Sequence, residues 1–205
     1  SLLAAAVAAF ASQSAMAQVP IFWVPASGLW SNPLKWNPNH VPALPQDQAI
    51  LAGSGAYTAT LDIPGQVVGI DIANAAAILS MNPGTVLAVG SAGLNTGLIN
   101  DGTLQINGSL PAPFNPPNTA LITQLRFPAG AVISGSGTIR LNADPTLLDS
   151  AFVSADPGFT WTNSPGHTIA GTGRLYGPAS NLGAITADQP GKVLQIAGDI
   201  TNSGT

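Results

Sequence analysis

Cysteine and glutamate are absent from the sequence, and charged residues of all kinds make up only 7% of its 205 positions. Without cysteine the chain has neither disulfide bonds nor thiolate metal sites, so its stability must come from backbone hydrogen bonds and core packing. Ordinary soluble domains contain about 25% charged residues. We therefore expect a surface that is kept in contact with water mainly by serine, threonine, asparagine, glutamine and turn backbone.

Positive charge is especially scarce. The five basic residues are scattered singly along the chain, at Lys35, Arg126, Arg140, Arg174 and Lys192. Nucleic-acid binding needs several neighbouring basic side chains to neutralise phosphates, so we predict no nucleic-acid partner. Long apolar runs are also missing after residue 17, because Gly, Pro, Asn or Asp interrupts each one, and we predict no membrane span there.

Glycine, proline and apolar residues are, by contrast, abundant. The 23 glycines and 18 prolines favour turns and extended chain over long helices. The 45% hydrophobic content, arranged in short runs, supplies the burial that disordered segments lack. The composition therefore predicts a folded, all-β protein.

The first 17 residues have the order of a secretory signal peptide. Residues 2–11 form an uninterrupted apolar run, a polar Ser-Gln-Ser follows, and Ala15, Met16 and Ala17 form a small-x-small cleavage site. We predict a signal peptide over residues 1–17 and export of the mature chain; a buried core helix is the alternative. No initiator methionine or basic segment precedes the apolar run, so we expect a signal peptide truncated at its start.

Residues 18–48 differ from everything downstream. They contain Trp23, Trp30 and Trp36 among six prolines. Proline cannot donate to a sheet ladder and fixes φ, which disfavours a central strand. We predict that this segment is an irregular N-terminal cap over the end of a sheet, and that residues 49–205 form a repeat region.

Short apolar runs, bounded by turn residues and spaced like β-strands, fill the repeat region. The first of them are residues 49–51, 57–62, 67–72, 77–79, 86–89, 98–99 and 104–106. Several alternate apolar and polar side chains, which predicts strands with one buried and one solvated face. Residues 111–117 (PAPFNPP) and 144–158 are predicted to be surface loops.

One pattern recurs in the repeat region: an aliphatic residue, three intervening positions, then Gly and usually Thr. Its copies are LINDGT from Leu98, ISGSGT from Ile133, IAGTGR from Ile169 and ITNSGT from Ile200. Their glycines are 35, 36 and 31 residues apart, which is room for about two short coils of three strands. The recurrence predicts a β-solenoid that continues beyond residue 205, and chance similarity in a chain rich in Gly and Thr is the alternative.

These segments resemble the passengers of autotransporters and related bacterial surface β-helix proteins. GLWSNPLKW (28–36), a following Val41-Pro42 and YTATLD (57–62) are similar to the openings of such exported proteins, and residues 167–205 are similar to their repeats. The resemblance implies a right-handed parallel β-helix outside the cell, in adhesion, envelope or matrix roles. It brings no catalytic residues to this chain.

Candidate residues for chemistry are few. The nine acidic residues are all aspartates, and their densest group, Asp144, Asp149 and Asp156, lacks the spacing of a known calcium loop, so we favour turn-forming roles. The two histidines, His40 and His167, lie far apart and are predicted to be surface or turn residues. We predict no catalytic residue, no cofactor and no metal site.

Tryptophans are the remaining candidates for a binding site. Trp30, Trp36 and Trp161 would either stack on sugar rings or close the apolar interior as part of a cap, and for the first two we favour closure. The sequence thus predicts a non-enzymatic protein, secreted or on the outer surface of a bacterium, that serves as a structural stalk or adhesin-like passenger. Extracellular polysaccharide or a host or matrix surface is the expected partner. The alternatives are the first coils of a β-helix polysaccharide lyase or glycoside hydrolase, and a carbohydrate-binding module.

Overall fold

A computed structural model describes residues 17–91, 97–110 and 121–205. The predicted signal peptide, apart from Ala17, and the predicted loop 111–117 lie outside the described residues. Within the described ranges, regular structure is β-strand except for two single-turn 3-10 helices, η1 (Pro33–Lys35) and η2 (Leu148–Ser150). The prediction of an all-β protein is confirmed.

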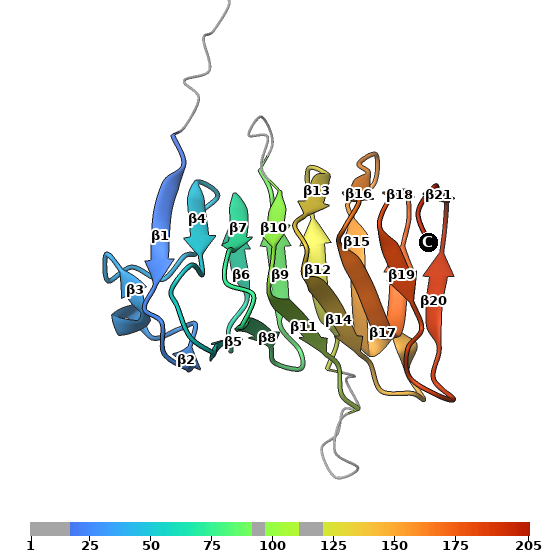
Figure 1. Cartoon of the computed structure of the whole chain (residues 1–205), viewed down its shortest axis with the longest axis horizontal. Helices are drawn as coiled ribbons and strands as arrows, with labels where there is room; N and C mark the ends of the chain where they lie inside the picture. The colour runs from blue at the N-terminus through green and yellow to red at the C-terminus, as the bar shows by residue number, and fades with distance from the viewer. Residues whose placement is uncertain (1–16, 92–96, 111–120) are drawn as a thin grey trace, which may run out of the picture.

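The strands form a nine-stranded and a twelve-stranded sheet, and nearly all of the pairing is parallel (Figure 1). We call the first sheet A; the second has two parts joined by the long strand β17, which we call sheets B and C. Sheet A contains, in spatial order, β3 (Trp36–Asn37), β1 (Val19–Trp23), β4 (Asp47–Ile50), β7 (Gly69–Ile72), β10 (Leu98–Asn100), β13 (Ala131–Ser134), β16 (Trp161–Asn163), β18 (Ala179–Asn181) and β21 (Ile200–Asn202). Sheet B contains β2 (Gly28–Leu29), β5 (Tyr57–Leu61), β8 (Ala77–Met81), β11 (Thr103–Asn107), β14 (Thr138–Asn142), the first half of β17 (Thr168–Tyr176) and β19 (Ala184–Thr186). Sheet C contains β6 (Gly65–Val67), β9 (Val86–Val89), β12 (Thr123–Phe127), β15 (Ala151–Ala155), the second half of β17 and β20 (Leu194–Ala197).

From β4 onward the chain passes through the sheets in one order: a strand of sheet A, then of sheet B, then of sheet C. We call one such passage a circuit; β4, β5 and β6 form the first, and β18, β19 and β20 the last complete one. In the circuit that begins with β16, the long strand β17 serves both sheet B and sheet C. Successive circuits lie side by side along the long axis of the molecule, from blue to red in Figure 1.

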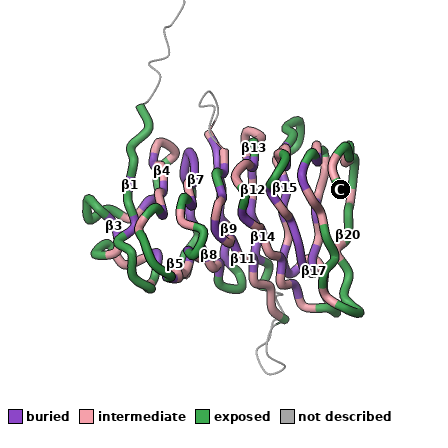
Figure 2. Tube along the Cα trace, viewed as in Figure 1, coloured by how far each residue is buried: buried purple, intermediate pink, exposed green. Residues whose placement is uncertain are grey.

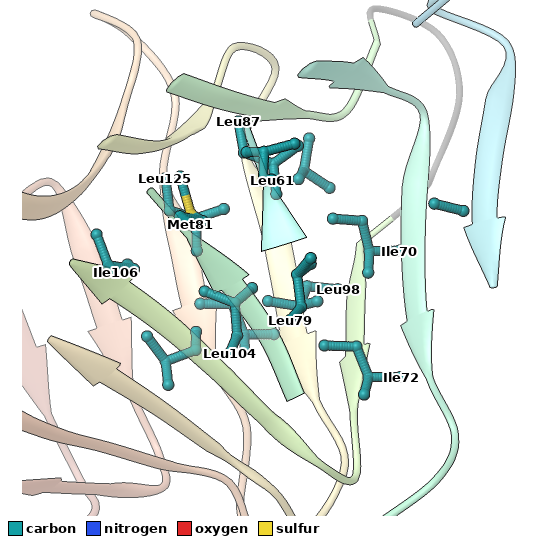
Figure 3. Close-up of a cluster of buried hydrophobic side chains, with 14 of the residues drawn as sticks. Leu61, Ile70, Ile72, Leu79, Met81, Leu87, Leu98, Leu104, Ile106 and Leu125 are labelled. Atoms are coloured by element: carbon teal, nitrogen blue, oxygen red, sulfur yellow. The ribbon is translucent and has the colours of Figure 1, made fainter. Parts of the chain in front are cut away.

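Buried residues alternate with more exposed ones along many of the strands, and Figure 2 colours the Cα trace by this burial. Because successive side chains of a strand point to opposite faces, one set lies inside the circuits and the other outside. In sheet B, Leu79, Leu104 and Ile139 hold the same register position in successive circuits, and all three are completely buried. Figure 3 shows inward side chains of all three sheets in one cluster, with Ile70 from sheet A and Leu125 from sheet C. Burying each such aliphatic side chain contributes roughly 1.5–3 kcal/mol, so the interior is the main source of stability.

The predicted repeat is only partly correct. The copies that begin at Leu98 and Ile133 are equivalent, because these two residues are partners in sheet A. Ile169, however, pairs with Ile139 in sheet B, and the sheet A column continues instead through Asn163 and Asn181. Glycine occurs at the corners between sheets in general, so an aliphatic residue followed by Gly does not specify one corner.

The prediction of about two coils per period is wrong for the first period, since the equivalent residues Leu98 and Ile133 are one circuit apart, and circuits differ in length. Asp101 and Ser136, in equivalent turns of successive circuits, are 35 residues apart. Asn163 and Asn181 are separated by 18 residues. Insertions between strands account for the difference, so the glycine spacing measures loop length as well as the repeat.

The segment 18–48, predicted to be irregular, contributes a regular strand to sheet A. Strand β1 pairs in parallel with β4 and in antiparallel fashion with β3. The amide of Val19 donates to Gln46 O, so by alternation the nitrogen of Pro20 points away from β4. The antiparallel partner β3 begins to pair only at Phe22, so Pro20 interrupts no ladder hydrogen bond.

Two other segment predictions are corrected by the strands. Residues 67–72, predicted to be one strand, are divided between β6 of sheet C and β7 of sheet A, with the buried Val68 at the corner. Residues 144–158, predicted to be a surface loop, contain η2 and the regular strand β15, which pairs with β12 along its whole length.

No helix in the described part of the chain is long and apolar enough to cross a membrane.

Candidate functional site

The tryptophans near the N-terminus form a buried cluster. Trp30 and Trp36 are completely buried, with ring centroids 4.6 Å apart in an edge-to-face arrangement, and Trp23 meets Trp36 edge-on at 4.8 Å. The indole N–H of Trp36 donates to Trp30 O at 2.8 Å, and that of Trp30 donates to Pro42 O at 3.2 Å. Both indoles are therefore anchored as parts of the interior.

Trp161 lies on β16, in a circuit far along the chain from this cluster, and is also completely buried. Its indole N–H donates to Tyr176 O at 2.8 Å. The structure does not bring Trp30, Trp36 and Trp161 together, and none of the three offers a ring face to solvent. Stacking of a sugar on any of them would require the interior to open.

The three clustered aspartates are also kept apart. Asp144 accepts hydrogen bonds from the backbone N–H and hydroxyl of Thr146, whereas Asp149 and Asp156 bind different arginines. The Thr146 hydrogen bonds lower the pKa of Asp144 below its usual value. Within the described ranges, no group of three or more His, Cys, Asp or Glu side chains is arranged to hold a metal ion.

His40 takes part in a hydrogen-bond cluster around Asp47, which we call the latch. Its Nε2 lies 3.0 Å from the carboxylate of Asp47, which also accepts the backbone N–H groups of Ala43 and Leu44 at 3.0 and 2.9 Å. The Asp47 side chain is only 2% exposed, while that of His40 is 45% exposed. The latch ties the loop before β4 to the start of that strand.

His167, predicted to be a surface or turn residue, lies in the turn between β16 and β17, where it is completely buried rather than at the surface. Its Nδ1 is 2.7 Å from Asn163 Oδ1, and its Nε2 is 3.1 Å from Asn100 Nδ2. An amide nitrogen only donates, so the network assigns a neutral ring that carries its proton on Nδ1. Burial lowers the pKa of His167 to about 4, and the negative charge of Asp101 opposes this shift in part.

Asn163 also begins a ladder of amides along the inner side of sheet A. Its Nδ2 donates to Asn181 Oδ1 at 2.7 Å, and Asn181 Nδ2 donates to Asn202 Oδ1 at 2.7 Å. Asn163 and Asn181 are completely buried. Because every amide of such a ladder needs a partner, the ladder fixes the register of these circuits.

The outer surface of sheet C is the place where charged and aromatic side chains gather. We call this surface the sheet C face; it consists of Gln124 and Arg126 on β12, Phe152 and Ser154 on β15, Arg174 and Tyr176 on β17, Gln195 on β20, and the flanking Asp149 and Asp156. The alternating neighbours Leu125, Val153 and Leu175 are completely buried, so these side chains point outward. Two of the five basic residues of the chain lie here.

Arg126 and Asp156 form a two-pronged ion pair on this face. Arg126 Nε donates to one carboxylate oxygen of Asp156 and Nη2 to the other, both at 2.6 Å. The hydrogen bonds raise the pKa of Arg126 and lower the pKa of Asp156. The side chains are 43% and 27% exposed, so the ion pair contributes little to stability. Its main effect is to hold the two side chains in a fixed geometry.

Arg174 is the centre of the larger network. Its Nη1 donates to the carboxylate of Asp149 at 2.6 Å and to the Tyr176 hydroxyl at 2.8 Å, while Nε and Nη2 donate to Gln195 Oε1 at 3.0 and 2.7 Å. The Tyr176 hydroxyl donates in turn to Asp149 at 2.7 Å. Hydrogen bonding to Tyr176, followed by the charge of Asp149, raises the pKa of Arg174. Phe152 meets the Tyr176 ring edge-on at 5.3 Å.

Sequence reasoning did not find the sheet C face. Apart from Arg174 and Tyr176, the residues that touch are separated by 21 to 30 positions, as Arg174 is from Gln195 and Arg126 from Asp156. The available signal was a shared alternation in TQLRF, AFVSA and TGRLY, in each of which an aliphatic residue (Leu125, Val153 or Leu175) stands between two polar or aromatic ones. That signal becomes a surface only when the register between circuits is known.

None of the protein families, curated proteins or solved structures compared with the chain gives a match.

Proposed function

We propose that this chain is part of a right-handed parallel β-helix that is exported by a bacterium and serves as a rigid, non-enzymatic scaffold or adhesin-like passenger at the cell surface. The observation that supports the helix is the repeated order of sheets A, B and C, with parallel register between successive circuits. Right-handed crossovers join parallel strands in about 98% of cases, which supports the hand.

The mechanical role follows from how the circuits are joined. Adjacent circuits share ladder hydrogen bonds in all three sheets and a common apolar interior, so bending one circuit against the next disturbs both. On the outside, polar side chains such as Thr103, Gln105 and Thr138 form hydrogen bonds with water, so the surface is solvated although it carries few charges. A stiff rod of this kind holds a surface at a distance from its anchor.

Export is supported by the sequence of residues 1–17, which has the order of a secretory signal peptide. The alternative of a β-helix lyase or hydrolase requires a set of acids and bases converging on one cleft. On the sheet C face the carboxylates of Asp149 and Asp156 are instead each bound to an arginine.

Because the predicted signal peptide is truncated at its start, the chain is expressed in a bacterium with an initiator methionine and a basic segment placed before residue 1. Cell fractionation and mass determination then test export. We expect a product that begins at Gln18 in the periplasm or outside the cell, with β-type far-UV circular dichroism and the X-ray scattering of an elongated particle. An unprocessed product in the cytosol, or a compact spherical particle, would contradict the proposal.

A further inference from the structure

We infer that the sheet C face is a binding site for an uncharged polysaccharide, which lies across strands β12, β15, β17 and β20. The inference rests on the proposed function in one respect, that this face is exposed outside the cell. The sheet C face, and not the buried tryptophans, is then the surface that contacts carbohydrate.

The hydrogen-bonding groups of the face match the chemistry of sugar hydroxyls, which donate and accept at once. Arg126 uses Nε and Nη2 to hold Asp156, and among the described residues its Nη1 has no hydrogen-bond partner. A carboxylate oxygen accepts more than one hydrogen bond. Neighbouring sugar hydroxyls can therefore bridge the pair, accepting a hydrogen bond from the guanidinium and donating one to the carboxylate.

The same groups are already held in place before a ligand arrives. Arg174 is fixed on three sides by Asp149, Tyr176 and Gln195, and the sheet beneath fixes the spacing of the strands. Little side-chain freedom remains to be lost on binding, which favours affinity. Phe152 and Tyr176 add half-buried aromatic surface against which the C–H groups of a sugar ring can pack.

Charge selects an uncharged ligand. Each arginine of the face is balanced by an aspartate, so the face offers no excess positive charge to a uronate or sulfate. The whole chain carries a net charge of −4, which repels polyanions at a distance. The carboxylates of the face are already bound by arginines, so they do not favour a cationic ligand either.

The outer surface of sheet B provides an internal comparison. Arg140 on β14 pairs with Asp188 at 2.9 Å, with both side chains 34% exposed, much like the pairs on the sheet C face. Its register neighbours are Gln105 and Ala170, neither of which is aromatic. Sheet B thus offers an arginine–aspartate pair without the aromatic contact, and Arg140→Gln is the matched control for Arg174→Gln.

The test measures binding of the purified full chain to neutral probes (cellohexaose, laminarin and galactomannan) and to anionic ones (alginate and polygalacturonate), by titration calorimetry and affinity electrophoresis. We expect saturable binding to at least one neutral probe. Arg174→Gln and Arg174→Lys should each weaken it roughly tenfold or more, because lysine keeps the charge but lacks the planar fork. Arg140→Gln should change it less than about twofold.

Circular dichroism and thermal melting establish that each variant is folded, and Gln195→Ala, an exposed change that removes one support of Arg174, serves if Arg174→Gln does not fold. Failure to bind any neutral probe, binding to anionic probes alone, or equal binding by the wild type and the folded sheet C variants would each overturn the inference. An exported, elongated protein that binds no glycan overturns this inference alone, whereas a glycan-binding protein retained in the cytosol overturns the proposed function alone.

Discussion

Acid should weaken the fold through His167. In the folded chain burial lowers the pKa of this imidazole from 6.5 to about 4. Between these values the unfolded chain binds a proton that the folded chain does not, so stability is complete above pH 6.5 and is lost as the pH falls toward 4. Each pKa unit corresponds to about 1.4 kcal/mol, so lowering the pH from 7.5 to 4.5 should remove about 2.5 kcal/mol through this residue.

Urea denaturation at several pH values, for the wild type and for His167→Gln, measures this contribution. Glutamine can donate to Asn163 and accept from Asn100 without titrating, so the variant should lose about 2.5 kcal/mol less between pH 7.5 and 4.5. A His167→Gln curve parallel to that of the wild type, or an NMR titration of His167 near pH 6.5, would refute the reasoning.

Three substitutions, each measured by urea denaturation, test the packing. Leu104→Ala should cost about 2–5 kcal/mol because its column is completely buried, and a cost below about 1 kcal/mol would contradict a packed interior. Trp36→Ala should cost about 3–5 kcal/mol and loosen the N-terminal circuits, whereas an unchanged midpoint would argue against the buried cluster. Gly171→Ala, whose Cβ would overlap the carbonyl oxygen of Leu141, should cost several times more than Gly158→Ala, where nothing lies within 4 Å. Both glycines have a positive φ, which costs a substituted residue about 1 kcal/mol, so equal costs would refute the close approach of circuits.

The sequence was sufficient for the general class of the fold because that class depends on local patterns. Alternation in YTATL and TLQIN predicted β5 and β11, and both strands bury every second residue. The equivalence of Leu98 and Ile133 was also visible, since both precede a turn that ends in Gly-Thr. Circuit length was not visible, because insertions between strands carry no periodic signal.

The sites were harder to predict than the fold because they depend on register across circuits. The burial of His167 could not be predicted, because it depends on hydrogen bonds to Asn100 and Asn163. Asn100 comes from another circuit, so these bonds form only when the circuits are stacked. Likewise, Asp149 gains its role from Arg174 and Tyr176, which are 25 and 27 residues away. The tryptophans carried an ambiguous signal, because an indole suits an interior and a sugar equally well.

The register between circuits is the central claim, and an engineered disulfide tests it most directly in a chain that has no cysteine of its own. Thr103 and Thr138 are register partners in neighbouring circuits, where strand spacing of about 4.8 Å suits a disulfide. Thr168 lies one circuit further on. Thr103→Cys with Thr138→Cys should form an intramolecular disulfide rapidly under mild oxidation, and Thr103→Cys with Thr168→Cys should not; no bond in the first pair, or equal rates in both, would contradict the stacked circuits.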